Sequence, residues 1–145
     1  MRTENSGKRK RVVILGATGS IGDSTLKVAN DIPERMEIVG LAANSNAEKL
    51  AAAANITRAR AICLVDERKI DILRAELQYE PKIFVGENGL REIARLEDAD
   101  MVLIAIVGTA GLHPALDAIE SGKDLAVASK EILVRESSVR SLRDQ

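Results

Sequence analysis

A glycine-rich segment close to the amino terminus has the spacing of a diphosphate-binding loop. Residues 16–22 read Gly-Ala-Thr-Gly-Ser-Ile-Gly and follow a short apolar run. In a strand–loop–helix unit, Gly16 would allow the turn, Gly19 would let the backbone approach a diphosphate, and Gly22 would permit close packing of helix on strand. The spacing therefore predicts a loop that presents the amino terminus of a helix to an anionic ligand.

The glycine-rich loop, residues 16–22, predicts binding of a dinucleotide. The helix terminus supplies unpaired N–H groups and a partial positive charge, and the hydroxyls of Thr18 and Ser20 add donors. The alternative is a glycine-rich turn without a ligand, but the position between a first strand and a helix favours the cofactor. A Walker-type phosphate loop is excluded because the Gly-Lys-Ser/Thr ending is missing.

A second candidate site follows the second predicted strand, where residues 42–46 read Ala-Ala-Asn-Ser-Asn. Enzymes that use NAD usually place an acidic residue here for the adenine ribose, and this loop has none. Ser45 and Asn46 can donate hydrogen bonds to a 2′-phosphate, which a carboxylate would repel. The loop therefore favours NADP(H), although it contains no arginine and Lys49 lies a turn further on. Asn46 is also a plausible N-cap of the next helix.

A third candidate site is Ser129-Lys130-Glu131, directly after the last predicted strand. A charged pair that emerges from a buried strand is well placed for a ligand; the alternative is a helix start with Ser129 as its N-cap. His113 is interpreted as a loop or cap residue, and Cys63 as a core residue. No pair of His, Cys, Asp or Glu has convincing metal-ligand spacing.

Short apolar runs alternate with helix-like segments along the chain. The apolar runs predict buried strands at residues 12–15, 37–42, 61–65, 82–85, 100–105 and 124–128. The segments between them predict helices over residues 20–30, 47–54, 67–78, 88–95 and 114–121. This alternation predicts an α/β fold, a Rossmann-type doubly wound parallel sheet, with strand order 3-2-1-4-5-6. Ligands bind such sheets at the carboxyl ends of the strands, so one crevice is expected between residues 16–22, 43–46, 106–111 and 129–131.

The composition fits one domain with an aliphatic core. The chain has 145 residues, of which 46% are hydrophobic and only 1% aromatic. The scarcity of aromatic residues argues against binding of single-stranded nucleic acid, which uses aromatic stacking. A net charge of −1 produces no overall electrostatic attraction to nucleic acid or to an anionic membrane. Residues 1–11 are expected to form a flexible basic lead-in, and residues 12–145 the NADP(H)-binding Rossmann domain. No signal peptide or membrane span is recognisable, and a single cysteine suits a reducing cytoplasm.

Three segments closely resemble 1-deoxy-D-xylulose 5-phosphate reductoisomerases. They are residues 13–26, which open on Val-Ile-Leu-Gly-Ala-Thr-Gly-Ser-Ile-Gly, residues 104–112, Ile-Ala-Ile-Val-Gly-Thr-Ala-Gly-Leu, and residues 128–134, Ala-Ser-Lys-Glu-Ile-Leu-Val. The segments occur in the order and at the spacing of that family. Two positions depart from its pattern, because Asn44 stands where the family usually has Gly, and Ser129 where Asn is common.

The resemblance implies an enzyme of isoprenoid biosynthesis. Such an enzyme isomerises 1-deoxy-D-xylulose 5-phosphate on a divalent metal, Mg or Mn, and reduces the resulting aldehyde with NADPH to 2-C-methyl-D-erythritol 4-phosphate. The positions that the resemblance assigns to NADPH are Thr18, Gly19, Ser20 and Ile21 for the diphosphate, Asn44, Ser45 and Asn46 for the 2′-phosphate, and Ser129 and Glu131. It assigns Lys130 to the phosphorylated sugar substrate.

The resemblance also implies that catalysis needs more than this chain. The metal ligands, the lid and the substrate-phosphate residues of the family lie beyond the position of Gln145, in catalytic and C-terminal domains. This chain is therefore expected to bind dinucleotide without catalysing, and the full-length enzyme is expected to be a homodimer. Two alternatives are a fragment of an acyl-phosphate or semialdehyde reductase, which the Ser-Lys-Glu segment disfavours, and a stand-alone NADP-sensing module.

Overall fold

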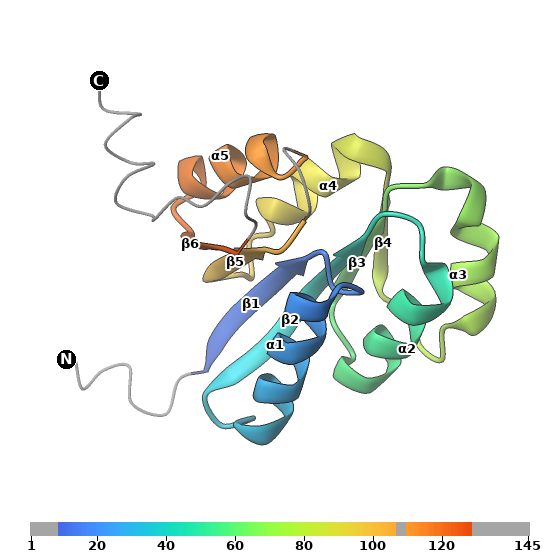
Figure 1. Ribbon diagram of the computed structural model, residues 1–145, viewed down its shortest axis with the longest axis horizontal. Helices are drawn as coiled ribbons and strands as arrows, with labels where there is room; N and C mark the ends of the chain where they lie inside the picture. Colours follow the sequence, from blue (N-terminus) through green and yellow to red (C-terminus); the bar gives the residue numbers. More distant parts are fainter. Residues whose placement is uncertain (1–8, 107–109, 129–145) are drawn as a thin grey trace.

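The computed structural model describes residues 9–106 and 110–128, which form one parallel sheet between two layers of helices (Figure 1). The strands are β1 (Lys10–Leu15), β2 (Met36–Ala43), β3 (Ala61–Leu64), β4 (Lys82–Val85), β5 (Met101–Ile104) and β6 (Asp124–Val127). Neighbouring strands pair in parallel in the order β4-β3-β2-β1-β5-β6. The predicted fold class, a Rossmann-type doubly wound parallel sheet, is confirmed.

Helices cover both faces of the sheet. They are α1 (Ser20–Asp31), α2 (Ala47–Thr57), α3 (Ile70–Glu76), α4 (Gly86–Ala94) and α5 (Leu112–Glu120), and the 3-10 turn η2 (Glu67–Lys69) leads into α3. α1, α2 and α3 contribute to one buried apolar cluster, and α4 and α5 contribute to the other. The sheet is therefore buried on both sides, as near-continuous apolar strands require.

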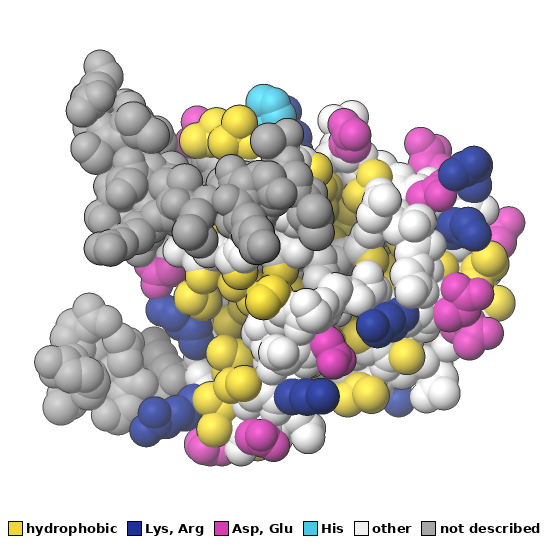
Figure 2. All heavy atoms as spheres, in the orientation of Figure 1, with side chains coloured by type: hydrophobic (Ala, Val, Ile, Leu, Met, Phe, Trp, Pro, Cys, Tyr) yellow, Lys and Arg dark blue, Asp and Glu magenta, His cyan; other side chains and the backbone are white. Residues whose placement is uncertain are grey.

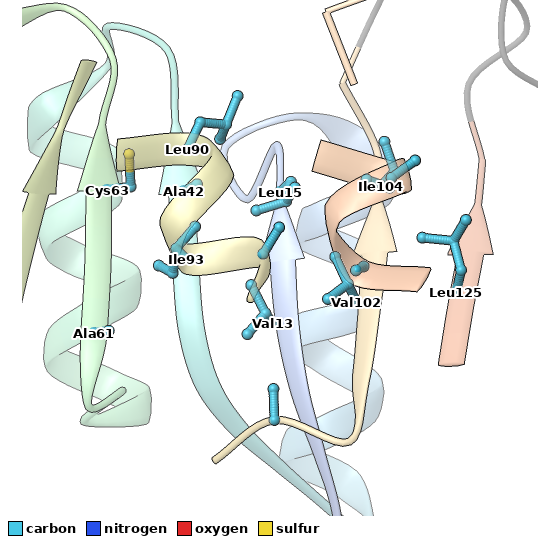
Figure 3. Packing of buried hydrophobic residues seen from close by; sticks show 14 of the residues in the cluster. Val13, Leu15, Ala42, Ala61, Cys63, Leu90, Ile93, Val102, Ile104 and Leu125 are labelled. Carbon is cyan, nitrogen blue, oxygen red and sulfur yellow. The ribbon is translucent and has the colours of Figure 1, made fainter. Parts of the chain in front are cut away.

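Successive residues of β1 serve the two faces in turn. Val12 and Ile14 belong to the cluster under α1 to α3, whereas Val13 and Leu15 belong to the cluster under α4 and α5. Figure 3 shows this second cluster, in which Ile93 of α4 packs over the sheet. These four side chains are at most 1% exposed, so this part of β1 lies at the centre of the core.

The predicted strand order, 3-2-1-4-5-6, is wrong at one point, because β4 lies outside β3 and not beside β1. α3 shares a face with α1 and α2, and a right-handed crossover on that face carries the chain one strand further in the same direction. α4 then returns on the opposite face, so β5 pairs with β1. The strand order therefore reverses between β1 and β5, which makes this the switch point of the sheet.

Gly89 permits the close approach of α4 to β4, since a Cβ there would lie 2.9 Å from the Cβ of Phe84.

Most predicted boundaries agree with the structure within three residues. β1 begins at Lys10, two residues before the predicted strand, so Lys10 and Arg11, expected in the lead-in, are strand residues. The helix predicted after β3 is divided into η2 and α3, and it ends at Glu76. The N-cap predicted at Asn46 is confirmed, because its side-chain oxygen accepts a hydrogen bond of 3.1 Å from the Lys49 N–H.

No helix within residues 9–106 and 110–128 is long and apolar enough to cross a membrane. On the face shown in Figure 2, Lys and Arg side chains are interspersed with Asp and Glu side chains over the described residues.

Candidate functional site

A cavity of about 500 Å³ opens at the carboxyl edge of the sheet, beside the switch point. The loops after β1, β2, β3 and β5 and the helices α4 and α5 form its walls. The lining residues are Gly16, Thr18, Gly19, Ala42, Ala43, Asn44, Val65, Glu87, Leu90, Arg91, Ala105, Ile106, Ala110, His113 and Pro114. The tertiary structure thus brings the glycine-rich loop and the loop after β2 to one crevice, as predicted.

Two of the three loop glycines are required by the protein itself. Gly16 has a φ of +95°, and a Cβ there would lie 2.6 Å from the Ala105 carbonyl oxygen. A Cβ on Gly22 would lie 2.5 Å from the Gly16 carbonyl oxygen and 2.7 Å from the Ala17 Cα. Gly16 therefore makes the turn out of β1, and Gly22 lets α1 pack against the loop, which are the two roles predicted for them.

Gly19 is different, because nothing in the described fold requires a glycine there. Its φ of −86° and ψ of 178° suit any residue, and a Cβ would meet only the Gly16 carbonyl oxygen, at 3.7 Å. Gly19 is the N-cap of the twelve-residue helix α1 and makes no side-chain capping bond. The first-turn N–H groups are thus free of a side-chain cap beside open space, which is the environment that a diphosphate needs.

The residues beside Gly19 face outward. Thr18 lines the cavity, and Ser20 and Ile21, the first two residues of α1, are exposed. Ile21 is 44% exposed and Val28 is 49% exposed, so neither lies on the buried face of α1. In this helix only Gly22 and Ala29 are buried.

The loop after β2 lies beside the glycine-rich loop. The backbone N–H groups of Gly16 and Ala17 both donate to the Ala42 carbonyl at 2.9 Å, and the Asp66 N–H donates to the Asn44 carbonyl at 2.8 Å. Ser45 is exposed, as are Asn44 and Asn46. The three side chains that were assigned to the 2′-phosphate are therefore accessible to a ligand.

Lys49 reaches this site, which sequence reasoning did not foresee. Its Nζ donates a hydrogen bond of 3.0 Å to the Thr18 carbonyl oxygen, 31 residues earlier in the chain. The one signal in the sequence is the N-cap at Asn46, which places Lys49 in the first turn of α2. The direction of the side chain toward the glycine-rich loop depends on the packing of α2 on β2.

An ion pair between a half-exposed arginine and a buried aspartate lies on the opposite side of the cavity. The Arg91 guanidinium of α4 donates from Nε and Nη2 to the Asp117 carboxylate of α5, at 2.7 and 3.2 Å. Asp117 is 2% exposed, and the hydrogen bonds to its carboxylate raise the pKa of Arg91. Arg91 and Asp117 are 26 residues apart, so no local sequence pattern predicts that they pair.

The structure also shows where His113 and Cys63, the other residues considered from the sequence, lie. His113 lies in the first turn of α5, on the cavity wall, and Cys63 is fully buried in β3. Burial raises the pKa of the Cys63 thiol to about 12, so the thiol is protonated at neutral pH. Ser129, Lys130 and Glu131 lie outside the described residues. Within the described ranges, no three His, Cys, Asp or Glu side chains are grouped to hold a metal ion.

A doubly wound parallel sheet with a glycine-rich turn at its switch point defines a dinucleotide-binding domain of the Rossmann type. A model of the 1-deoxy-D-xylulose 5-phosphate reductoisomerase family matches residues 12–137, and the chain belongs to this family. The alternative hypothesis, a fragment of an acyl-phosphate or semialdehyde reductase, is therefore rejected.

Curated relatives and solved structures agree with this assignment. The chain is 44% identical over 128 residues to the 1-deoxy-D-xylulose 5-phosphate reductoisomerase of Crocosphaera subtropica, which covers 86% of the chain and 32% of the relative. The corresponding enzyme of Zymomonas mobilis, solved in complex with NADPH, superposes with a TM-score of 0.79 at 38% identity over 86% of the chain and 33% of that structure. A further reductoisomerase, solved with NADPH, fosmidomycin and magnesium, has a TM-score of 0.75 at 40% identity, over 84% of the chain and 30% of that structure. The chain thus spans about a third of the length of these relatives.

Proposed function

We propose that this chain is the NADPH-binding region of a 1-deoxy-D-xylulose 5-phosphate reductoisomerase. The observation that carries the proposal is Gly19, which lies at the open amino terminus of α1. The fold itself does not require a glycine at this position, so the absence of a side chain is available to a ligand. Relatives of the same family that have been solved with NADPH support it.

In this proposal the chain's own residues bind and orient the cofactor. The amides of Ser20 and Ile21, with the hydroxyls of Thr18 and Ser20, receive the diphosphate beside Gly19. Asn44, Ser45 and Asn46 surround the adenosine 2′-phosphate. Bound in this way, NADPH supplies the hydride that reduces the aldehyde intermediate.

We propose that catalysis requires the full length of the family's enzymes. By likeness to the family, Ser129 and Glu131 of this chain contact the cofactor and Lys130 binds the phosphorylated sugar. The described residues offer no group of three His, Cys, Asp or Glu side chains for a divalent metal. We further propose that the full-length enzyme is a cytoplasmic homodimer.

Titration of NADPH into the 145-residue chain by calorimetry tests the proposal, with Gly19→Val as the decisive variant. The branched side chain would occupy the diphosphate position, so NADPH affinity should fall by at least about tenfold. Folding should survive because a Cβ at Gly19 meets no close atom, and circular dichroism checks this.

Ser24→Val is the matched control, because Ser24 is exposed on α1 one turn beyond the loop. It should leave NADPH affinity unchanged. If Gly19→Val binds NADPH as the unaltered chain does, the diphosphate lies elsewhere. If the unaltered chain does not bind NADPH, the proposed function is wrong.

A further inference from the structure

Lys49 has a backbone carbonyl and not a carboxylate as its hydrogen-bond partner. Its ammonium group is held by a backbone carbonyl, that of Thr18, at 3.0 Å. Among the ion pairs of the described residues none involves Lys49, whereas Lys10, Arg11 and Arg60 each pair with a carboxylate. An ammonium group has three donors, so Lys49 keeps two donors and a full positive charge for another partner.

The position of this charge is fixed by two loops of the crevice. Lys49 extends from the first turn of α2, just after the loop that carries Ser45, and its Nζ rests on the residue that precedes Gly19. The ribose of a dinucleotide lies at the end of the second strand of this fold, and the diphosphate lies at the start of the first helix. Lys49 therefore lies between the expected positions of the ribose and the diphosphate.

Lys49 lines a hollow between α1 and α2, next to the cavity, and the acidic side chains of this hollow already have basic partners. Asp23 pairs with Lys27 at 3.6 Å and Glu37 with Arg9 at 3.1 Å, so the charge of Lys49 is not cancelled where it meets Thr18, which lines the cavity.

The Asp66 carboxylate, next to the loop that carries Ser45, is bound by Arg68 from Nε and Nη2, both at 3.0 Å. This hydrogen bonding holds the pKa of Asp66 below its usual value, and the two charges cancel. Glu48 is exposed to solvent, where its charge is screened.

We infer that Lys49 is the residue that selects NADPH over NADH in this chain, by pairing its ammonium group with the adenosine 2′-phosphate. This inference rests on the proposed function. It supplies the positive charge that the loop after β2 lacks, since Asn44, Ser45 and Asn46 offer the phosphate only neutral donors. The bond to Thr18 orients the side chain before the cofactor binds, which reduces the entropy lost on binding.

The test compares the dissociation constants of NADPH and NADH for the 145-residue chain and for Lys49→Met. Methionine keeps the length of the apolar stem and removes the charge. NADPH affinity should fall by about tenfold and NADH affinity by less than about twofold. The salt dependence of NADPH binding should also become shallower, and Lys49→Arg should retain most of the preference for NADPH.

Lys10→Met is the matched control, because Lys10 lies at the opposite end of the sheet, where it pairs with Asp124 at 2.7 Å. It should leave both affinities unchanged. If Lys49→Met weakens NADPH and NADH equally, Lys49 supports the diphosphate or the glycine-rich loop, and the inference is overturned. Unchanged NADPH affinity would overturn it as well.

A second variant separates this inference from the proposed function. Ser45→Asp brings a carboxylate to the same loop and should weaken NADPH more than NADH, whatever Lys49 does. If Ser45→Asp behaves in this way and Lys49→Met changes nothing, the site stands and the role of Lys49 is refuted. If the unaltered chain binds neither nucleotide, the proposed function itself fails.

Discussion

At the scale of single residues, the glycine-rich loop separates structural needs from ligand needs. Gly16 and Gly22 face backbone atoms so closely that a Cβ would collide with them, whereas a Cβ on Gly19 would be in ordinary van der Waals contact only. A motif of three glycines thus contains two positions that build the loop and one that leaves space for a ligand. The distinction predicts opposite results from substitutions three residues apart.

Gly22→Ala should destabilise the protein, although alanine favours helices more than glycine does. The new methyl carbon would lie 2.5 Å from the Gly16 carbonyl oxygen, so α1 must move away from the loop. Overpacking of this kind costs about 1–3 kcal/mol, which exceeds the gain in helix propensity of at most ~1 kcal/mol. Urea unfolding measures the loss.

Gly19→Ser is the control for this experiment, because serine is a good N-cap and a Cβ at this position is unobstructed. Its free energy of unfolding should stay within about 0.5 kcal/mol of the unaltered chain. Equal losses in the two variants would contradict the division of roles among the glycines.

At the scale of elements, the long return of the chain from β4 to β5 places α4 against α5. Arg91 and Asp117 join these two helices above the cavity, and Arg95 adds a longer contact of 3.8 Å to the same carboxylate. The two partners differ in exposure, because the Arg91 side chain is 46% exposed and the Asp117 side chain is 3% exposed. The pair therefore depends mainly on the arginine, which keeps a buried carboxylate satisfied.

Arg91→Met should cost more stability than Asp117→Asn. The arginine variant leaves a buried carboxylate with only a distant partner, and an unpaired buried charge costs about 3 kcal/mol. The asparagine variant removes the charge, leaves Arg91 in contact with solvent, and should cost about 1 kcal/mol. Chemical denaturation of both variants at pH 7 gives the two values, and the reverse ranking would contradict this account of the pair.

At the scale of the whole molecule, the two ends of the parallel strands differ in what they carry. The carboxyl edge carries the crevice, and the opposite edge carries ion pairs that tie strands together. Arg11 in β1 binds Asp100 just before β5, Lys10 binds Asp124 in β6, and Arg60 before β3 binds Asp98. Charges that stabilise the sheet are thus kept away from the site that would receive an anionic cofactor.

Asp100 should contribute to stability at neutral pH and lose this contribution in acid. Partial burial alone would raise the pKa of Asp100, but hydrogen bonds from the Arg11 side chain and N–H lower it overall. A carboxyl group with a lowered pKa stabilises the folded state above its unfolded value of about 3.9, and this stabilisation disappears as the pH falls through the folded pKa.

Asp100→Asn should therefore reduce the free energy of unfolding at pH 7, by at most about 1 kcal/mol because the pair is partly exposed. The difference between the variant and the unaltered chain should shrink as the pH falls below about 4. Urea midpoints measured between pH 7 and pH 2.5 check this. Ser24→Ala, on the exposed side of α1, removes no titratable group and is the control; its difference from the unaltered chain should not change with pH.

The sequence by itself determined the type of fold and most of the candidate site. Apolar runs of four to six residues between helical segments predicted all six strands, because strand and helix periods are local properties. The glycine spacing predicted the loop at the end of β1, and the absence of a carboxylate after β2 led to the prediction of NADP(H) in the crevice. These features depend on neighbours in sequence, so they can be recognised in sequence.

Only the tertiary structure decided which elements meet. It placed β4 outside β3, brought the Lys49 ammonium group to the Thr18 carbonyl, and buried Asp117 against Arg91. Each of these contacts joins segments that are at least 20 residues apart, and each follows from the face of the sheet on which a helix packs. The choice of face is made by the packing of the whole core, to which every strand and helix contributes, and no single segment encodes it.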